Sequence, residues 1–302
     1  MDSAWLEIKN SSLRLVIDPI GAKIVHFGLR TGGNILQSCL HKKTYTPDEC
    51  GGFPLLPMGN RVRGNSYQLQ SASGRMQTIK LNCTSPDGSE YLHGTGWNSE
   101  WLYENYSVNP ETEAKTLAFK MSNTHGEAGK GYNFEAMLMF SLAPTSLSIV
   151  LSLEHKGSAS RLYGLGFHPY FEFDPQQDQV CAAVGAYAPE VEGHFSGEFT
   201  PDMGKWNISR PTLLPDEFVN HIYSGFSGVE LYRPNFPGPL KRIRMTSSAS
   251  YLMMYRPKGS NFLALEPQTH VVDAANRADK GGLFKLTQDF HHIDAFWRIE
   301  LC

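Results

Sequence analysis

Two neighbouring stretches of this sequence place an apolar residue at every second position, and this alternation restricts the fold more than any other feature. The first covers residues 134–142, where the alternating residues are Phe, Ala, Leu, Phe and Leu, and the second covers residues 147–153, with Leu, Ile, Leu and Leu. A period of two is typical of a β-strand with one face on a core. Pro144-Thr145 lies between the two stretches, which together predict a β-hairpin.

The rest of the chain repeats this pattern in shorter pieces. Gly and Pro interrupt nearly every interval, and no long stretch keeps the i, i+3, i+4, i+7 spacing of an amphipathic helix. Many short strands with aromatic-rich faces indicate a mainly β fold, either a sandwich or a barrel. The shorter predicted strands are Leu13–Ile17, Lys23–Phe27, Lys115–Met121, Tyr251–Tyr255 and Phe296–Leu301.

The organisation of the chain favours one folded unit. Its 302 residues suffice for a sizeable core, and no internal repeat, low-complexity tract or linker divides them. Predicted strands lie near both ends, as expected if the ends join a common sheet. We therefore expect a single domain over residues 1–302, with residues 185–215 forming loops that carry short elements of their own.

Composition and charge exclude several classes of function. The net charge is −3 with no run of five like charges, so the concentrated basic surface of a nucleic-acid-binding protein is missing. No stretch reaches the roughly eighteen consecutive apolar residues of a membrane span, and Met1–Asn10 does not resemble a signal peptide. Five cysteines at irregular spacings, without a C-x-x-C pair, favour free thiols in a reducing compartment. We therefore expect a cytoplasmic protein. We also expect a monomer, because no strand or helix presents an obvious exposed apolar stripe.

Four segments place polar side chains among Gly, Pro and aromatic residues. They are Phe53–Arg63, Leu92–Trp97, Gly164–Phe171 and Leu263–His270. Glu266 follows an apolar, strand-like run and precedes Pro267, which we expect to end regular pairing. A carboxylate at the end of an apolar strand is costly to bury unless it is paired or used.

Each of these segments also has a structural explanation. His168 lies among apolar residues, where a lone histidine is more often a satisfied core residue than a catalyst, and Arg61 and His93 are equally consistent with turns. Together the segments favour chemistry, because a His and a Glu can exchange protons with opposite sides of one substrate. An Arg adds a fixed fork of donors, and a second His with aromatic residues adds contacts to hydroxyl groups.

Motifs of other enzyme classes are missing. No H-E-x-x-H or paired cysteines predict a metal site, and His291-His292 would face opposite ways on a strand. The G-x-S-x-G elbow of a serine hydrolase and the phosphate-binding patterns G-x-x-x-x-G-K-[ST] and G-x-G-x-x-G do not occur.

The ordered set of segments resembles the aldose 1-epimerase (galactose mutarotase) family. The resemblance rests on Asn60-Arg61-Val62, Leu92-His93-Gly94, Gly166–Phe171 and Glu266–His270, followed by Asp273–Asn276. It covers about residues 53 to 276 and implies the large antiparallel β-sandwich of that family, the galactose mutarotase-like supersandwich. The H-G-x-G-W form of Leu92–Trp97 is closer to the galactose-type branch than to the hexose-6-phosphate branch.

The resemblance also implies roles for residues. Glu266 would be the base at the C1 hydroxyl of a free hexose and His168 the acid at the ring oxygen, and their roles reverse when the ring closes. His93 and Arg61 would hold sugar hydroxyls and the developing charge, with Asn60 and Gln268 as substrate-binding neighbours. Trp97 and Tyr170 would either stack on the sugar or pack in the core. No metal or other cofactor is implied, and the expected partner is a small-molecule sugar.

One position departs from the family pattern. The family has an Asp that binds a sugar hydroxyl just before an aromatic-Gly segment, and Asn220 stands at that place here. Asn forms hydrogen bonds but lacks the charge that strengthens them. Asp216, four residues earlier, takes this role if the alignment has slipped.

Three hypotheses remain open from the sequence. The first is a mutarotase for a free hexose, and the second is a non-catalytic carbohydrate-binding protein on the same fold, which the presence of both Glu266 and His168 disfavours. The third is a mutarotase for a phosphorylated hexose, which requires basic residues to converge at the mouth of the cleft. The basic candidates are Arg61, Arg63, Arg161 and Arg256.

Overall fold

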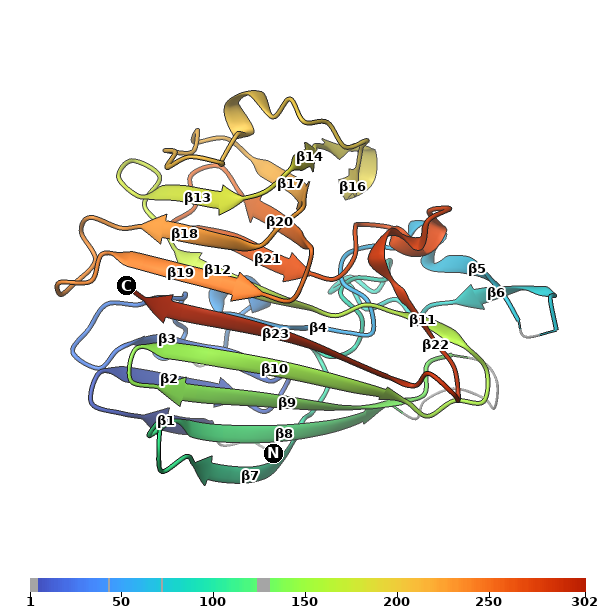
Figure 1. The fold of residues 1–302 in the computed structure, drawn as a ribbon, viewed down its shortest axis with the longest axis horizontal. Coiled ribbons are helices and arrows are strands. Elements are labelled where there is room, and N and C mark those ends of the chain that lie inside the picture. Colours follow the sequence, from blue (N-terminus) through green and yellow to red (C-terminus); the bar gives the residue numbers. More distant parts are fainter. Residues whose placement is uncertain (1–4, 43, 72, 124–130) are drawn as a thin grey trace.

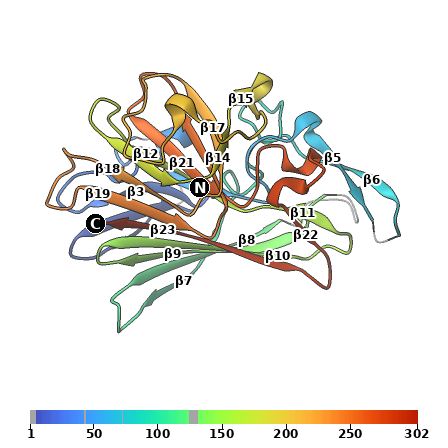
Figure 2. The ribbon, with the colours of Figure 1, turned by 45° about the horizontal axis from the view of Figure 1, so that its top comes forward.

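The structure is a computed structural model that describes residues 5–42, 44–71, 73–123 and 131–302. Two large sheets of antiparallel strands are packed face to face (Figures 1 and 2). The nine-stranded sheet has the order β1 (Leu6–Lys9), β2 (Leu13–Asp18), β3 (Lys23–Leu29), β4 (Gly52–Leu55), β12 (Gly166–Glu172), β21 (Phe262–Gln268), β20 (Tyr251–Arg256), β17 (Val219–Ser224) and β14 (Ala186–Ala188). The eight-stranded sheet has the order β13 (Gln179–Ala183), β18 (Gly228–Tyr232), β19 (Arg242–Ser247), β23 (His292–Leu301), β10 (Ser146–His155), β9 (Phe134–Ala143), β8 (Lys115–Asn123) and β7 (Leu102–Val108).

The remaining elements are short. Three small sheets pair β5 (Ser66–Gln70) with β6 (Met76–Lys80), β11 (Arg161–Tyr163) with β22 (Phe284–Leu286), and β15 (Glu190–Val191) with β16 (Phe195–Ser196). The helical turns are η1 (Pro47–Glu49), η2 (Arg63–Asn65), η3 (Glu192–His194), η4 (Gly204–Trp206), η5 (Ala274–Asn276) and η6 (Lys280–Gly282). The mainly β sandwich predicted from the sequence is confirmed, and residues 185–215 are loops with short elements, as expected.

The predicted hairpin is formed by β9 and β10. Ala143 pairs with Ser146 at the turn, and the alternating apolar residues of both strands are buried. The other predicted strands also exist, with boundaries shifted by a few residues. The largest shift is in β23, which begins at His292 because polar side chains on its outer face alternate with the buried Ile293 and Ala295.

The core lies between the two large sheets. Phe167 of β12 packs against Trp297 of β23 with ring centroids 5.8 Å apart. The indole nitrogen of Trp297 donates a hydrogen bond to the carbonyl of Pro267, 3.0 Å away, which ties the eight-stranded sheet to β21. Side chains alternate along a strand, so Phe167 and Phe171 of β12 face this core while His168 and Tyr170 face outward from the sandwich.

One expectation about β21 is wrong. Pro267 does not end the strand, which continues to Gln268, with Leu252 of β20 opposite Pro267. The pairing of β21 with β12 is instead interrupted between Gly166–Gln268 and Tyr170–Ala264. Proline lacks the N–H that a ladder requires, and Pro169 and Pro267 both lie in this interrupted stretch. His168 and Glu266 therefore lie in the stretch where the pairing of β12 with β21 is interrupted.

The edge strand β7 differs from the expectation that no apolar stripe is exposed. All seven of its residues are exposed, including Leu102 at 61% and Val108 at 49%. Within the sheet β7 pairs with β8 alone, and it lies at the border of the sandwich (Figure 1). An edge strand has fewer neighbours to cover its side chains, and its pattern in the sequence does not reveal that position.

Two further findings concern the whole chain. All five cysteines are free thiols. Among the helices of the described ranges, none combines the length and apolar character needed to span a membrane.

Candidate active site

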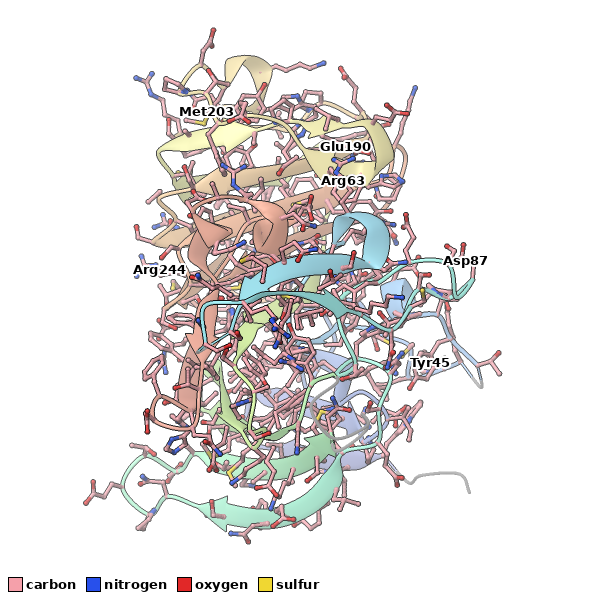
Figure 3. The ribbon with its side chains drawn as sticks, turned by 90° about the vertical axis from the view of Figure 1, so that its right-hand side faces the viewer. Tyr45, Arg63, Asp87, Glu190, Met203 and Arg244 are labelled. Carbon is pink, nitrogen blue, oxygen red and sulfur yellow. The ribbon has the colours of Figure 1, made fainter. Side chains whose placement is uncertain are left out.

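A cavity of about 360 Å³ opens on the outer face of the nine-stranded sheet. Figure 3 separates the two faces: Arg244 of the eight-stranded sheet lies at the left, and Tyr45 and Asp87, whose loops border the cavity, lie at the right. Six of the seven predicted site residues line the cavity: Asn60, Arg61, His93, His168, Asn220 and Glu266. The other lining residues are Pro47, Asp48, Phe53, Pro86, Leu92, Trp97, Tyr170, His194, Phe218 and Tyr255.

Glu266 and His168 form the centre of the cavity wall. They lie on the adjacent strands β21 and β12, and Oε1 of Glu266 is 3.1 Å from Nε2 of His168. Their side chains are only 3% and 5% exposed. The second carboxyl oxygen of Glu266 and Nδ1 of His168 are buried and have no hydrogen-bond partner among the described residues. The acid and base candidates are therefore in direct contact.

Burial governs the ionisation of this pair. It raises the pKa of Glu266 well above its ordinary value. It also lowers the pKa of His168 well below the ordinary value, and the neighbouring His93 adds to this effect. Both shifts disfavour charge. The neutral pair and the carboxylate–imidazolium pair have the same number of protons and differ by the transfer of one proton across the contact. The pair therefore titrates as a unit.

Aromatic rings enclose the histidine of this pair. Tyr170 stacks on His168 with ring centroids 4.4 Å apart, and Phe53 lies 4.9 Å away on another side. The hydroxyl of Tyr170 is 3.4 Å from Nε2 of His168. Trp97 contacts Phe53 at 5.8 Å and donates its N–H to the carbonyl of Gly94 at 3.1 Å. Both aromatic residues singled out from the sequence, Trp97 and Tyr170, thus line the cavity.

His93 is held in one protonation form by its neighbour Asn60. The backbone N–H of Asn60 donates to Nδ1 of His93 at 3.1 Å, and the backbone N–H of His93 donates to the carbonyl of Asn60 at 3.0 Å. Burial, with a smaller contribution from Arg61, lowers the pKa of His93 to about 3. The ring is therefore neutral near pH 7, and because Nδ1 accepts, the proton lies on Nε2. His93 can donate one hydrogen bond into the cavity.

Arg61 lies on the cavity wall and is already paired. Its Nε donates to the carboxylate of Glu90 at 2.8 Å, and the two side chains are 25% and 47% exposed. Sequence reasoning did not identify Glu90. The pair fixes the plane of the guanidinium and leaves the two Nη groups of Arg61 as donors.

Gln268 has a different place from the one predicted. It does not line the cavity; it is fully buried, and its carbonyl oxygen accepts from the side chain of Asn60 at 2.9 Å. Two residues on, Nε2 of His270 accepts the backbone N–H of Gly59 at 3.0 Å. The residues after Glu266 thus hold the Gly59–Asn60 turn, which in turn orients His93. Gln268 is two residues after Glu266 and shares its face of β21, so alternation alone would place it in the cavity. The Gly59–Asn60 turn covers it instead, which the pattern along the strand does not reveal.

Asn220 of β17 lines the cavity, as the family alignment predicts. Its cross-strand neighbour is Tyr255 of β20, another lining residue. The alternative, Asp216, lies elsewhere: its Oδ1 accepts from the buried Arg256 at 2.8 Å and from the backbone N–H of Gly259 at 2.9 Å. The carboxamide of Asn220, and not the carboxylate of Asp216, faces the cavity.

The other basic residues do not converge on the cavity. Arg63 lies over the ring of Phe195 at 4.0 Å, beside the loop that carries Glu190 (Figure 3), and its Nε is 3.6 Å from Asp273. Arg161 is buried and donates to the carbonyl of Gly131 at 2.9 Å. Of the four basic candidates, Arg61 alone lines the cavity among the residues that the structure describes.

Six lining residues went unnoticed in the sequence: Pro47, Asp48, Pro86, His194, Phe218 and Tyr255. Tyr255 belongs to a predicted strand, and the other five lie in connections outside the four segments. No local pattern marks them, because their approach to the cavity depends on how distant loops fold. In the same described part of the chain, no group of three or more His, Cys, Asp or Glu side chains is placed to hold a metal ion.

Comparison with known proteins bears on the family and the fold of the chain. The profile of the family described as aldose 1-epimerase matches residues 5–288. An Escherichia coli K12 protein named "Uncharacterized protein YphB" is 27% identical over 287 residues, 92% of each chain. The crystal structure of a provisionally assigned aldose 1-epimerase from the same organism is 25% identical, with a TM-score of 0.86 over 99% of each chain. A galactose mutarotase-like protein from Clostridium acetobutylicum shares the fold at 15% identity, with a TM-score of 0.82 over 100% of this chain and 99% of its own.

Proposed function

The chain belongs to the aldose 1-epimerase family, and from this premise we propose that it interconverts the α and β anomers of a free hexose. The observation that carries the proposal is the contact between Glu266 and His168, 3.1 Å apart and buried in the wall of a cavity. The cavity is large enough for one sugar ring, and its polar and aromatic lining suits a molecule with hydroxyl edges and apolar faces.

The proposed reaction opens the sugar ring at C1 and closes it on the other face. Opening requires one proton for the ring oxygen and the removal of one proton from the C1 hydroxyl. Both oxygens are bonded to C1, so they lie close together, and two groups in contact can serve both. Glu266 takes the hydroxyl proton and His168 gives a proton to the ring oxygen. Rotation about the C1–C2 bond and reversal of the two transfers complete the change of anomer.

The coupled ionisation of the pair supports this exchange. Ring opening starts from the carboxylate–imidazolium form of the pair, which is one proton transfer across the contact away from the neutral form. When Glu266 has accepted and His168 has donated, the pair is neutral, which is the state that burial favours. The reverse transfer restores the carboxylate and the imidazolium without any proton from bulk water. The same two residues can therefore close the ring of the open-chain sugar on either face of C1.

Two further residues are proposed to hold the substrate. His93 presents Nε2–H, and Arg61 presents its Nη groups, to hydroxyls or to the charge that develops as the ring opens. Asn60 and Gln268 act indirectly, because their hydrogen bonds fix the turn beside His93. Asn220 offers a carboxamide to a hydroxyl farther along the cavity.

The arrangement of charges favours a free sugar over a phosphorylated one. A phosphate group requires uncommitted cations, and the basic residue at this cavity, Arg61, already pairs with Glu90. Arg256 is fully buried against Asp216.

A purely binding role is disfavoured because a binder gains nothing from burying a carboxyl whose pKa is raised. We further propose that the protein is cytoplasmic, in keeping with its five free thiols. The expectation of a monomer stays a prediction, because the exposed side chains of β7 remove the reason given for it.

The test is polarimetry on freshly dissolved α-D-galactose and α-D-glucose, with and without the protein. We expect faster relaxation to the same final rotation, and a loss of at least about a hundredfold in kcat for Glu266→Gln and His168→Asn. Acceleration that survives in both variants contradicts the proposed pair. No acceleration, combined with sugar binding by titration, supports the binding-protein alternative.

A further inference from the structure

Asp48 is a charged residue of the cavity wall that the proposed chemistry does not use. It lies in η1, a short turn that leads into β4, and both Pro47 and Asp48 line the cavity. The same cavity is lined by His168 and Glu266, so the turn and the proton-transfer pair face one space. Asp48 itself is exposed, whereas Glu266 is buried.

Among the described residues the carboxylate of Asp48 forms no ion pair, although its charge acts on Lys42. Among the described residues that line the cavity, Asp48 and Glu266 are the only carboxylates. Nearby acids are committed elsewhere: Glu90 pairs with Arg61, and Glu49, the next residue in the turn, pairs with Lys42 at 2.5 Å. Oδ1 of Asp48 accepts from the hydroxyl of Thr46 at 2.5 Å, and Oδ2 accepts no hydrogen bond from the residues that the structure describes.

The field of Asp48 reaches two tyrosines of the cavity. Burial raises the pKa of Tyr170, and the charges of Glu266 and Asp48 add to this effect. Burial also raises the pKa of Tyr255, with Asp48 as the largest charge contribution. Tyr170 stacks on His168, and Tyr255 is the cross-strand neighbour of Asn220. Asp48 is therefore near both the proton-transfer pair and the wall that carries Asn220.

We propose that Asp48 is a specificity-determining residue, which accepts a hydrogen bond from a hydroxyl of the bound aldose away from C1. The inference rests on the proposed function and names the group that selects among aldoses. Asn220 supplies no charge, so Asp48 is the exposed carboxylate of the cavity lining that can give a hydroxyl a charged hydrogen bond. A carboxylate only accepts, and it binds a hydroxyl more strongly than a carboxamide does.

The first experiment compares Asp48→Asn with a matched control, Glu49→Gln. Both variants remove one negative charge from the same turn, but only Asp48 lines the cavity. We expect Asp48→Asn to raise KM about tenfold, the loss typical of one charged hydrogen bond at a partly exposed site. The change in kcat should be smaller, because the hydroxyl is not a reacting group. Glu49→Gln should leave KM within about twofold of the unaltered protein.

The second experiment identifies the hydroxyl with the 2-, 3-, 4- and 6-deoxy analogues of the better hexose. A site built to bind a hydroxyl rejects the analogue that lacks it. We expect one deoxy analogue to show a KM about tenfold higher than its parent with the unaltered protein, and no such difference with Asp48→Asn. The four KM values, for two proteins and two sugars, form a double-mutant cycle between the residue and the hydroxyl.

The outcomes separate the inference from the proposed function. If the unaltered protein accelerates mutarotation and Asp48→Asn keeps its KM, the inference fails and the proposed function stands. A fall in kcat with unchanged KM also overturns it, because binding is then not what Asp48 provides. If the unaltered protein neither converts nor binds any of these aldoses, in polarimetry and in calorimetric titration, both are overturned.

Discussion

At the scale of single residues, Glu266 combines reactivity with a penalty for stability. It is fully enclosed, one of its oxygens has no partner among the described residues, and burial raises its pKa. A carboxyl group in such a place can exchange a proton near neutral pH. The same burial disfavours its ionised form in the folded state, so Glu266 lowers the free energy of unfolding wherever the unfolded protein ionises it.

Glu266→Gln should therefore stabilise the protein while removing its activity. The folded-state pKa lies above the unfolded value of about 4.3, so the carboxylate destabilises the folded state at high pH and contributes nothing below about pH 4. We expect Glu266→Gln to raise the free energy of unfolding by at least about 1 kcal/mol at pH 8. The gain should shrink as the pH falls to 4. Urea denaturation at pH 8, 6 and 4 measures it, and a gain that does not depend on pH contradicts the assignment.

Arg61 and Arg63 form a natural pair for comparison, because only the first lines the cavity. Arg61→Ala removes donors to the substrate and leaves the half-exposed Glu90 unpaired. We expect kcat/KM to fall about tenfold to a hundredfold, the range for a lost charged hydrogen bond. Arg63→Ala should change kcat/KM by less than about threefold. Equal losses in the two variants would assign Arg61 a role in folding and not in binding.

At the scale of elements, the turn at His93-Gly94 orients the site. Both residues have positive φ, 59° for His93 and 73° for Gly94, and this turn lies against Leu56. A Cβ added at Gly94 would stand 2.1 Å from the carbonyl oxygen of Leu56, so no side chain fits there. The backbone of this turn thus places the ring of His93 against Asn60.

Gly94→Ala should disrupt both stability and activity, and Gly88→Ala is its control. Gly88 has a similar φ of 70°, but a Cβ there would meet nothing within 4 Å. Gly88→Ala should lower the free energy of unfolding by about 1 kcal/mol, the effect of a left-handed conformation alone. Gly94→Ala should lower it by several kcal/mol and reduce kcat/KM in proportion to the displacement of His93. Thermal denaturation and polarimetry measure both, and equal effects at the two glycines would contradict the steric argument.

At the scale of the whole molecule, buried histidines make the fold sensitive to acid. Burial lowers the pKa of His26 to about 4 and that of His93 to about 3. Burial likewise lowers the pKa of His270 to about 4, although the hydrogen bond with Gly59 opposes this shift. His93 and His270 both accept from the Gly59–Asn60 turn, so their effects are expected to be coupled, whereas His26 lies on β3 and bonds Ser38.

The stability should fall between about pH 6.5 and pH 4. The unfolded histidines, with pKa near 6.5, bind protons that the folded ones refuse, so each contributes about 2 kcal/mol of destabilisation at pH 5. Glu266 acts with the opposite sign, and the sharper test therefore compares variants. We expect His270→Gln to reduce the loss of stability between pH 7.5 and pH 5 by about 2 kcal/mol in urea denaturation. The exposed His291→Gln should not, and the same slope in both variants would count against the argument.

The sequence by itself determined the features that depend on neighbouring residues. Alternation with a period of two follows directly from the geometry of a strand, and it predicted the hairpin of β9 and β10 together with the buried face of each strand. The four polar segments predicted which strands and turns contribute to the site, including Glu266, His168 and His93.

Only the tertiary structure decided how these segments meet. The direct contact of Glu266 with His168 depends on the register of β12 and β21, and Gln268 is separated from the cavity by the Gly59–Asn60 turn that covers it. Asp48 and Tyr255 reach the cavity because residues about two hundred positions apart fold side by side. Strand pairing and loop approach are non-local, whereas the pattern along a chain reports only the near neighbours of each residue.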